Sequence, residues 1–217
     1  MSRSHRIRVL LVEDQQMFLQ GLERALTDVD DIEVVGTAAT LEDAVRCAHV
    51  LSPDVVLMDY FLPDGDGALA TEKIKAERPD TKVVMLTAYE DEEVLVASIE
   101  ARCSGFVTKS NALGDAVAAV RAAAAGEALV SPDLLRRLLP KLRRASRGSR
   151  LELTARESQV LDLLARGYST KAMADQLYLS VNTVRNHTQA LLNKLNAHSK
   201  LEAVATAVRE GLIRFPA

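Results

Sequence analysis

The sequence predicts two domains of different class. The first is an α/β domain, a (βα)5 unit with a doubly wound parallel sheet, and the second is a small all-α unit of four helices. Three observations predict this: short β-branched runs alternate with helical patterns in the first half, no strand pattern follows residue 150, and a basic stretch separates the halves. We place the first domain at residues 1–127, a linker with a short helix at 128–150 and the second domain at 151–217.

The elements of the first domain follow from alternating patterns along the chain. Five short apolar runs are expected as strands: 7–12, 33–36, 54–58, 82–86 and 105–107. Five periodic stretches are expected as helices: 17–26, 41–51, 68–75, 92–101 and 113–124. The first and third runs are continuously apolar, as in strands that are buried on both faces.

The second domain carries helical patterns at 154–166, 170–177, 181–195 and 200–210. Gly126 is expected to stop the last helix of the first domain, and Thr154 with Glu157 forms a capping-box pattern. Only Tyr178, Leu179 and Ser180 separate the second and third patterns, which is the spacing of a helix-turn-helix.

Composition sets the class of protein. Of 217 residues, 48% are hydrophobic and 26% charged, which excludes a disordered or low-complexity chain. No apolar run is long enough to span a bilayer and no signal peptide precedes the first domain, so we expect a cytoplasmic protein with no membrane partner. Cys47 and Cys103 lie far apart without metal-like spacing, so neither a disulfide nor a zinc site is expected.

Charge is unevenly distributed along the chain. Residues 1–127 carry 12 basic and 23 acidic side chains, net −11, whereas residues 128–150 carry 7 and 1, net +6, and residues 151–217 carry 8 and 6, net +2. This asymmetry favours an acidic module joined to one that meets a nucleic acid or another anionic partner.

Acidic residues directly follow two of the expected strands. Glu13 and Asp14 come after the first and Asp59 after the third, so their carboxylates should meet at one edge of the sheet. Mg²⁺ is the cation that suits oxygen-only ligands with open water positions. Thr87 and Lys109 follow the fourth and fifth strands, and they add a hydroxyl and an ammonium to the same edge. Together these residues predict a phosphoryl-transfer site.

The first domain resembles the receiver domain of two-component response regulators. The resemblance rests on four segments: Leu11-Val12-Glu13-Asp14, Leu57-Met58-Asp59 with Pro63-Asp64-Gly65-Asp66-Gly67, Leu86-Thr87-Ala88, and Gly105-Phe106-Val107-Thr108-Lys109. It implies that Asp59 accepts a phosphoryl group from a sensor histidine kinase. It also implies that Asp14, Asp59 and the Phe61 backbone carbonyl hold Mg²⁺, with Glu13 acting mostly through water.

The same resemblance implies a switch. Thr87 would move toward the phosphoryl group and Phe106 would turn inward with it, and the surface over residues 91–125 would carry the change outward. One departure is Ser110, which stands where many receivers have Pro after the lysine.

The second domain resembles a LuxR-type helix-turn-helix. The matching residues are Leu153-Thr154-Ala155-Arg156-Glu157, Gly167-Tyr168-Ser169-Thr170-Lys171, Thr183-Val184-Arg185 with His187, and Lys194-Leu195. Both matches in this order are typical of the NarL/FixJ family of response regulators. The resemblance implies a transcription factor rather than an enzyme, with only Mg²⁺-dependent self-phosphorylation and autodephosphorylation in its receiver. Its expected partners are a sensor histidine kinase, a double-stranded DNA operator and, when phosphorylated, a second copy of the chain. It also implies a dimer seam on the last helical pattern, through Ala203, Val204, Ala207 and Val208, with packing inside the domain as the alternative.

The third helical pattern of the second domain has a polar face that suits DNA. Arg can pair with guanine, Asn and Gln with adenine, and hydroxyl or ammonium groups with phosphates. The residues expected to contact DNA are Ser180, Asn182, Thr183, Arg185, Asn186, Gln189 and Lys194.

Two other functions stay open at this point. An aspartyl-phosphate phosphatase resembling haloacid dehalogenases also uses an Asp after a buried strand, but it needs a second Asp two residues later, where Phe61 stands. A DNA-binding protein whose receiver serves only as a dimerisation scaffold is the other. The sequence also does not separate contact with RNA polymerase from simple repression.

Overall fold

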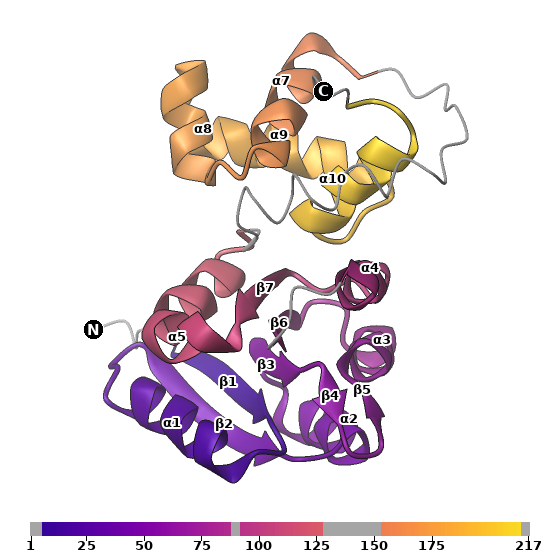
Figure 1. Ribbon diagram of the computed structural model, residues 1–217. Coiled ribbons are helices and arrows are strands. Elements are labelled where there is room, and N and C mark those ends of the chain that lie inside the picture. The colour runs from indigo at the N-terminus through magenta and orange to yellow at the C-terminus, as the bar shows by residue number, and fades with distance from the viewer. Residues whose placement is uncertain (1–5, 88–91, 128–152, 214–217) are drawn as a thin grey trace. The chain divides into compact units, whose positions relative to one another are not determined.

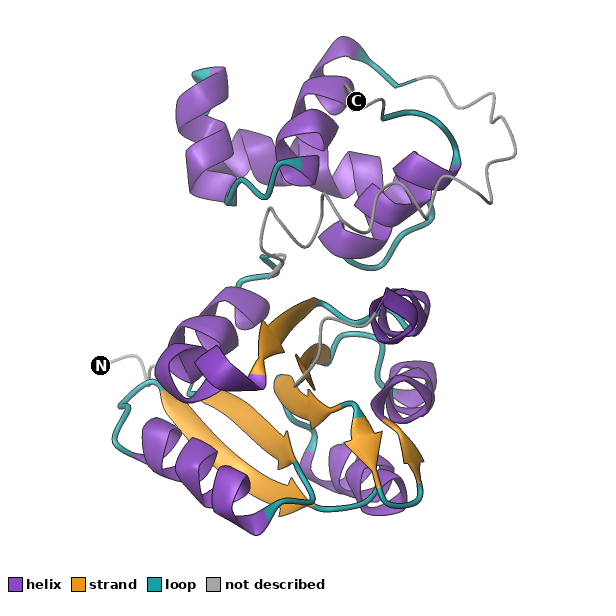
Figure 2. Cartoon of the chain, in the orientation of Figure 1, coloured by secondary structure: helices purple, strands orange, loops and turns teal. Residues whose placement is uncertain are grey.

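The computed structural model describes residues 6–87, 92–127 and 153–213. The chain divides into two compact units, Met1–Leu129 and Val130–Ala217, and each is considered by itself. Figure 1 labels the elements of both units, and Figure 2 colours them by type, with strands only in the first unit and helices alone in the described part of the second. The linker helix expected within 128–150 lies outside the described residues.

The first unit is built on a parallel sheet of five strands in the order β2-β1-β3-β6-β7. The strands are β1 (Ile7–Val12), β2 (Ile32–Ala38), β3 (Val55–Asp59), β6 (Lys82–Thr87) and β7 (Gly105–Thr108). The chain starts at β1, an interior strand, adds β2 on one side of it and then β3 on the other, so the order of strands reverses between β1 and β3. In sheets of this kind ligands bind at this switch point, outside the carboxyl ends of the strands. The predicted fold class is confirmed.

Helices cover both faces of this sheet (Figure 1). They are α1 (Gln16–Thr27), α2 (Leu41–Leu51), α3 (Gly67–Glu77), α4 (Glu92–Glu100) and α5 (Lys109–Ala124). The faces of α1 and α5 that carry Leu22, Leu26 and Val120 pack with Leu11 and Leu57 of the sheet into one aliphatic core. Burial of these side chains is the main force that stabilises the unit.

The structure adds a short element that the sequence did not predict. Two-residue strands, β4 (Phe61–Leu62) and β5 (Gly65–Asp66), pair as an antiparallel hairpin between β3 and α3. The helix α5 also begins at Lys109, four residues earlier than expected. The prediction missed this first turn because the polar segment Lys109-Ser110-Asn111 has no apolar periodicity.

The second unit contains, within residues 153–213, the helices α7 (Ala155–Ala165), α8 (Thr170–Leu177), α9 (Val181–Lys194) and α10 (Lys200–Arg209). The predicted capping box is confirmed, since Thr154 Oγ1 accepts from Glu157 N while Glu157 Oε2 accepts from Thr154 N. Val160, Val184, Leu191 and Leu201 are buried and supply aliphatic packing. No helix in the described parts of either unit is long and apolar enough to cross a bilayer.

Candidate functional site

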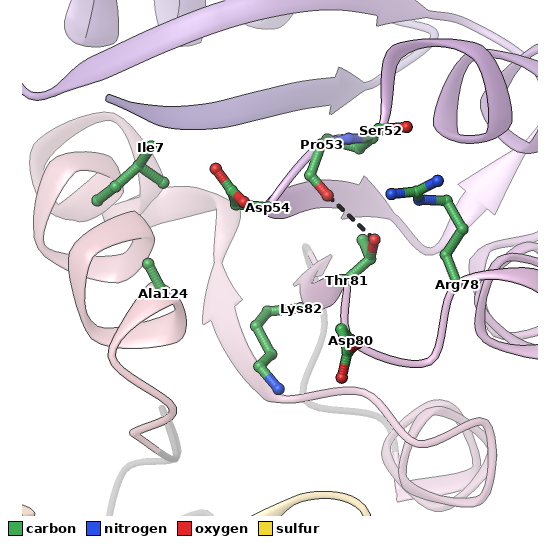
Figure 3. A pocket seen from close by; sticks show the side chains of 9 residues that line it. All are labelled: Ile7, Ser52, Pro53, Asp54, Arg78, Asp80, Thr81, Lys82 and Ala124. Atoms are coloured by element: carbon green, nitrogen blue, oxygen red, sulfur yellow. Dashed lines mark hydrogen bonds between the residues drawn. The ribbon is translucent and has the colours of Figure 1, made fainter. Parts of the chain in front are cut away.

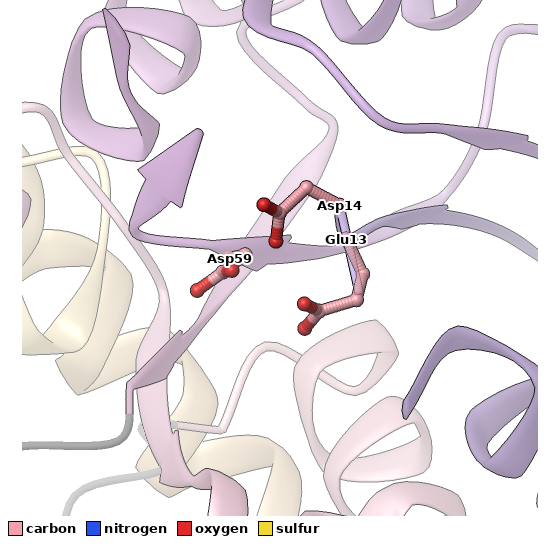
Figure 4. A group of neighbouring side chains, drawn as sticks. All are labelled: Glu13, Asp14 and Asp59. Atoms are coloured by element: carbon pink, nitrogen blue, oxygen red, sulfur yellow. The ribbon is translucent and has the colours of Figure 1, made fainter. Parts of the chain in front are cut away.

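Three carboxylates meet at the carboxyl end of the sheet (Figure 4). One oxygen from each of Glu13, Asp14 and Asp59 lies within 4.8 Å of the others. Glu13 follows β1 and Asp59 ends β3, two neighbouring strands, and this adjacency brings together residues 46 positions apart. Glu13 and Asp59 are buried, whereas Asp14 is exposed, so the cluster opens to solvent on the Asp14 side.

Lys109 supplies the positive charge of the site. Its Nζ lies 2.8 Å from Asp59 Oδ2 and 2.7 Å from Glu13 Oε2, and it also donates to Glu13 Oε1 at 2.9 Å. The Lys109 ammonium lies 5.1 Å from the centre of the ring of Phe18, a residue of α1. The sequence did not predict Phe18 as part of the site, and its position one turn into α1 is the only signal that could have suggested it.

The electrostatics follow from burial and from these bonds. Burial raises the pKa of Glu13 above its usual range, although the hydrogen bond from Lys109 works in the opposite direction. Burial by itself would lower the pKa of Lys109, but its hydrogen bonds to Asp59 and Glu13 outweigh that effect and raise it. The lysine therefore stays protonated and partly neutralises the buried acids.

The remaining predicted receiver residues lie on β4, β6 and β7. Thr87 ends β6 and is buried, and it pairs in register with Thr108, the residue before Lys109. Phe106, in β7, is buried at 7% exposure. Phe61 begins β4, its ring is exposed, and its backbone N–H donates a long 3.4 Å hydrogen bond to Asp59 Oδ1.

The donor set fits a hard divalent cation. All three side chains offer carboxylate oxygens, and no His or Cys joins the group among the residues that the structure describes. Ions such as Mg²⁺ favour one or two carboxylates and keep several waters, which the open Asp14 side allows. The acidic cluster is thus a site that could hold a metal ion.

A pocket at the opposite end of the sheet is a different feature (Figure 3). It surrounds the starts of β1 and β6, with Ile7 and Lys82 in its wall, and Thr81 Oγ1 donates to Pro53 O at 3.0 Å within it. This end of a parallel sheet is not where ligands of doubly wound folds bind. We assign it no function.

In the second unit, the turn between α8 and α9 comprises Tyr178, Leu179 and Ser180. Tyr178 adopts a left-handed conformation, φ 55°, and its side chain is 96% exposed. Ser180 caps α9, since its Oγ accepts from Thr183 N at 3.1 Å. The two helices are therefore joined by a tight turn, as the spacing predicted.

One face of α9 is polar and open. Asn182, Arg185, Asn186 and Gln189 are all exposed, with Arg185 Nη1 donating to Asn182 Oδ1 at 3.3 Å. Ser180 is also exposed and Thr183 is half-buried. These six expected DNA contacts thus lie on one side of the helix and on its N-cap.

Lys194, the seventh expected contact, has a partner within the unit. Its Nζ donates to Glu157 Oε2 at 2.8 Å, and this bond is the largest cause that lowers the pKa of Glu157 below its usual range. The bond ties the end of α9 to the start of α7. The sequence predicted Glu157 only as half of a capping box, because the pairing with a residue 37 positions away leaves no local signal.

The apolar residues expected as a dimer seam on α10 are Ala203, Val204, Ala207 and Val208. All four are buried in this chain, with exposures of 3% or less. They therefore do not form an open apolar stripe in the structure.

The fold and the site together define the class of protein: a regulator with a receiver-type α/β domain and a separate helix-turn-helix unit. The family description "Response regulator receiver domain" matches residues 9–121, and "Bacterial regulatory proteins, luxR family" matches residues 151–207. The chain belongs to the two-component response regulators of the NarL/FixJ family, with a receiver domain and a LuxR-type DNA-binding domain.

Proteins similar to this chain are described as response regulators. "Response regulator protein VraR" of Staphylococcus epidermidis is 34% identical over 96% of this chain and 99% of its own. The crystal structure of the response regulator ChrA of a heme-sensing two-component system is 29% identical, covers 96% of this chain and 99% of its own, and has a TM-score of 0.52. A LuxR-family response regulator from Aurantimonas sp. SI85-9A1 is 29% identical over 63% of this chain and 97% of its own, with a TM-score of 0.58.

Proposed function

We propose that a sensor histidine kinase switches this regulator by transferring a phosphoryl group to Asp59, and that the transfer promotes dimerisation and binding to a DNA operator. The observation that carries the proposal is the position of Asp59 at the end of β3. Its carboxylate is bound by the Lys109 ammonium at 2.8 Å and lies beside Glu13 and Asp14. Phosphoryl transfer to a protein needs a nucleophile, a positive charge and carboxylates that can bind a metal ion. Asp59, Lys109 and the pair Glu13 and Asp14 could supply them.

In the proposed transfer, Asp59 Oδ1 attacks the phosphorus of a phosphohistidine. An O–P bond forms, the N–P bond breaks, and the released imidazole nitrogen takes a proton from solvent. Asp14, Asp59 and the Phe61 carbonyl would hold Mg²⁺, and Glu13 would act through water. The ion would supply positive charge that neutralises the transferred group. Lys109 holds Asp59 Oδ2, which leaves Oδ1 with only its long bond from Phe61 N among the described contacts.

The proposed switch uses Thr87 and Phe106. A phosphoryl group adds close to two negative charges and strong acceptor oxygens, which the Thr87 hydroxyl can approach. Phe106 would follow, and the surface of α4, β7 and α5 would present the change to a second copy of the chain. A shift between two states that differ by a few kcal/mol is enough for such a response.

The DNA-binding part of the proposal places α9 in the major groove. Arg185 would read guanine, Asn182, Asn186 and Gln189 would read adenine, and Ser180, Thr183 and Lys194 would bond phosphates. A dimer would then match two half-sites. We propose domain limits of 1–127 and 151–217 with 128–150 as linker, a cytoplasmic location, and RNA polymerase as a further partner.

Intact mass and size-exclusion elution test the proposal. The protein is incubated with Mg²⁺ and a small phosphodonor, and the wild type is compared with Asp59→Ala. We expect the wild type to gain one phosphoryl group and to elute as a dimer, and the variant to do neither. A wild type that gains no phosphoryl group from the donor or from any histidine kinase, yet binds DNA, would instead favour the scaffold function.

A further inference from the structure

The β4–β5 hairpin links Asp59 to α3 and carries Phe61, whose backbone carbonyl is a proposed metal ligand (Figure 1). Each strand of the hairpin has only two residues, and an isolated two-stranded ribbon is marginal in water. Its placement therefore depends on what holds it from outside.

One side of the hairpin is held by α3. Asp66 caps that helix by accepting from Leu69 N at 2.7 Å, and Gly67 N donates to Tyr60 O at 2.7 Å. A Cβ at Gly67 would lie 2.3 Å from Asp59 O, so only a glycine allows the chain to pass this close to Asp59. These contacts fix the two ends of the loop, but not its tip.

The tip is held by α2, a helix that begins 23 positions earlier in the chain. Asp64 Oδ1 accepts from Leu41 N at 2.6 Å, and Asp64 Oδ2 accepts from Glu42 N at 3.0 Å. Thr40 supplies the acceptors for the next two N–H groups of α2, with Oγ1 for Asp43 and the carbonyl for Ala44. The Ala44 bond is the first regular bond of the helix, so the hairpin satisfies two of the three preceding N–H groups, those of Leu41, Glu42 and Asp43, that have no acceptor within the helix ladder.

A second contact at the same joint is steric. Gly65 lies against Leu41, where an added Cβ would come within 2.7 Å of Leu41 Cδ1. The tip of the hairpin therefore contacts α2 in two ways: both oxygens of the Asp64 carboxylate accept hydrogen bonds from it, and the adjacent Gly65 packs closely against Leu41. The two hydrogen bonds hold the pKa of Asp64 below its usual range, so the carboxylate is charged at neutral pH.

From this geometry we propose that Asp64 is a positioning residue of the metal site: by fixing the hairpin to α2 it holds the Phe61 carbonyl where Mg²⁺ is bound, although Asp64 itself is no ligand. The inference rests on the proposed function, which names Phe61 as a ligand. Groups that orient metal ligands from outside typically change metal affinity when they are removed. A hairpin that occupies the competent position only part of the time binds the ion correspondingly more weakly.

The test measures Mg²⁺ affinity directly on the unphosphorylated full-length chain. Backbone amide shifts are followed during Mg²⁺ titration of the wild type, Asp64→Asn, Asp64→Ala and the control Asp43→Asn, which removes a charge from the first turn of the same helix without touching the hairpin. We expect the dissociation constant to rise about tenfold in Asp64→Ala, less in Asp64→Asn, which keeps one acceptor, and to stay at the wild-type value in the control.

Three further readouts separate positioning from charge or general stability. The Leu41 and Glu42 amide signals should shift in both Asp64 variants while the spectrum of the second unit is unchanged. In phosphorylation by a small phosphodonor, the Mg²⁺ concentration at half-maximal rate should rise, with the rate at saturating Mg²⁺ changed less than about twofold. The affinity loss should also persist at raised ionic strength, because it does not arise from a screened surface charge.

Wild-type affinity in Asp64→Ala overturns the inference. Equal losses in both Asp64 variants that vanish with added salt also overturn it, since they would mean that Asp64 acts only through its charge. A wild type that binds Mg²⁺ but accepts no phosphoryl group would contradict the proposed function while leaving the affinity comparison intact.

Discussion

Replacing Lys109 by Met removes the cation that two buried carboxylates share and that stands 5.1 Å from the centre of the Phe18 ring, while it keeps an unbranched side chain only one atom shorter. Lys109 is 13% exposed, and its partners Glu13 and Asp59 are 0% and 3% exposed. Removing one partner of such a buried pair costs roughly 3–5 kcal/mol. The opening on the Asp14 side lets water and protons reach the acids, so we expect about 3 kcal/mol, the low end of that range.

The cost should depend on pH. Without Lys109, Glu13 loses the partner that lowers its pKa, and burial then raises that pKa further. An acid whose folded pKa lies above its unfolded value of about 4.3 destabilises the fold as pH rises through the interval between the two. The difference between variant and wild type should therefore shrink as the pH is lowered from about 7 toward 5.

The cost should also depend on Mg²⁺. An ion that binds only the folded state adds about 2.7 kcal/mol of stability at one hundred times its dissociation constant. With the competing ammonium gone, the acids should bind Mg²⁺ more tightly, so Mg²⁺ should recover most of the stability that Lys109→Met loses. Accepting a phosphoryl group should still be slower, because the lysine no longer meets the developing charge.

Hydrogen exchange of peptides from β1 and β3, with and without Mg²⁺, measures these effects in the receiver without assuming that both units unfold together. A loss below about 1 kcal/mol in the absence of Mg²⁺, or a loss that Mg²⁺ does not reduce, would refute the view that Lys109 neutralises the acid cluster.

Three other substitutions test separate features by the same method. Gly67→Ala places a Cβ 2.3 Å from Asp59 O, so it should cost about 1–3 kcal/mol and slow phosphorylation; wild-type behaviour would contradict the close packing. Tyr178→Asn removes an exposed, bulky residue from a left-handed conformation, so α8 and α9 should gain roughly 0.5–1 kcal/mol of protection, and a loss would show that the ring contributes packing. Glu157→Gln should destabilise the second unit at neutral pH, because the bond from Lys194 lowers the folded pKa of Glu157. That contribution is present above the unfolded pKa of about 4.3 and lost as pH falls through the folded value, so wild type and variant should converge in acid; a constant difference would exclude the ion pair as its source.

The sheet and the acid cluster were predictable because both follow from strong local patterns. The continuously apolar runs of β1 and β3 leave little choice but a buried parallel sheet, and in such a sheet the residues after each strand gather at one edge. Asp59 and Lys109, 50 positions apart, could therefore be placed together from the order of the strands along the chain.

What escaped prediction depends on partners that are distant in sequence or on very short elements. Two-residue strands have no period to detect, so the sequence predicts only a loop where the β4–β5 hairpin lies. In sequence Asp64 is only a typical turn residue. Its contact with α2 leaves no local signal, because the amides that its carboxylate accepts from lie 23 and 22 positions earlier in the chain. The sequence predicts a phosphate contact for Lys194 but not its hydrogen bond to Glu157, because the two residues are 37 positions apart.

The start of α5 at Lys109 has a mechanical consequence. With 16 residues the helix is about 24 Å long, so a tilt of roughly 5° about one end moves the other by about 2 Å. Its buried face is mostly alanine, at positions 112, 116, 119 and 123, and such small side chains interlock little with the sheet. If a shift of the Lys109 side chain moved the first turn of α5, the helix would tilt as a rigid body, because its small buried side chains resist little. The displacement would be largest at Ala124, the end from which the chain continues toward the second unit.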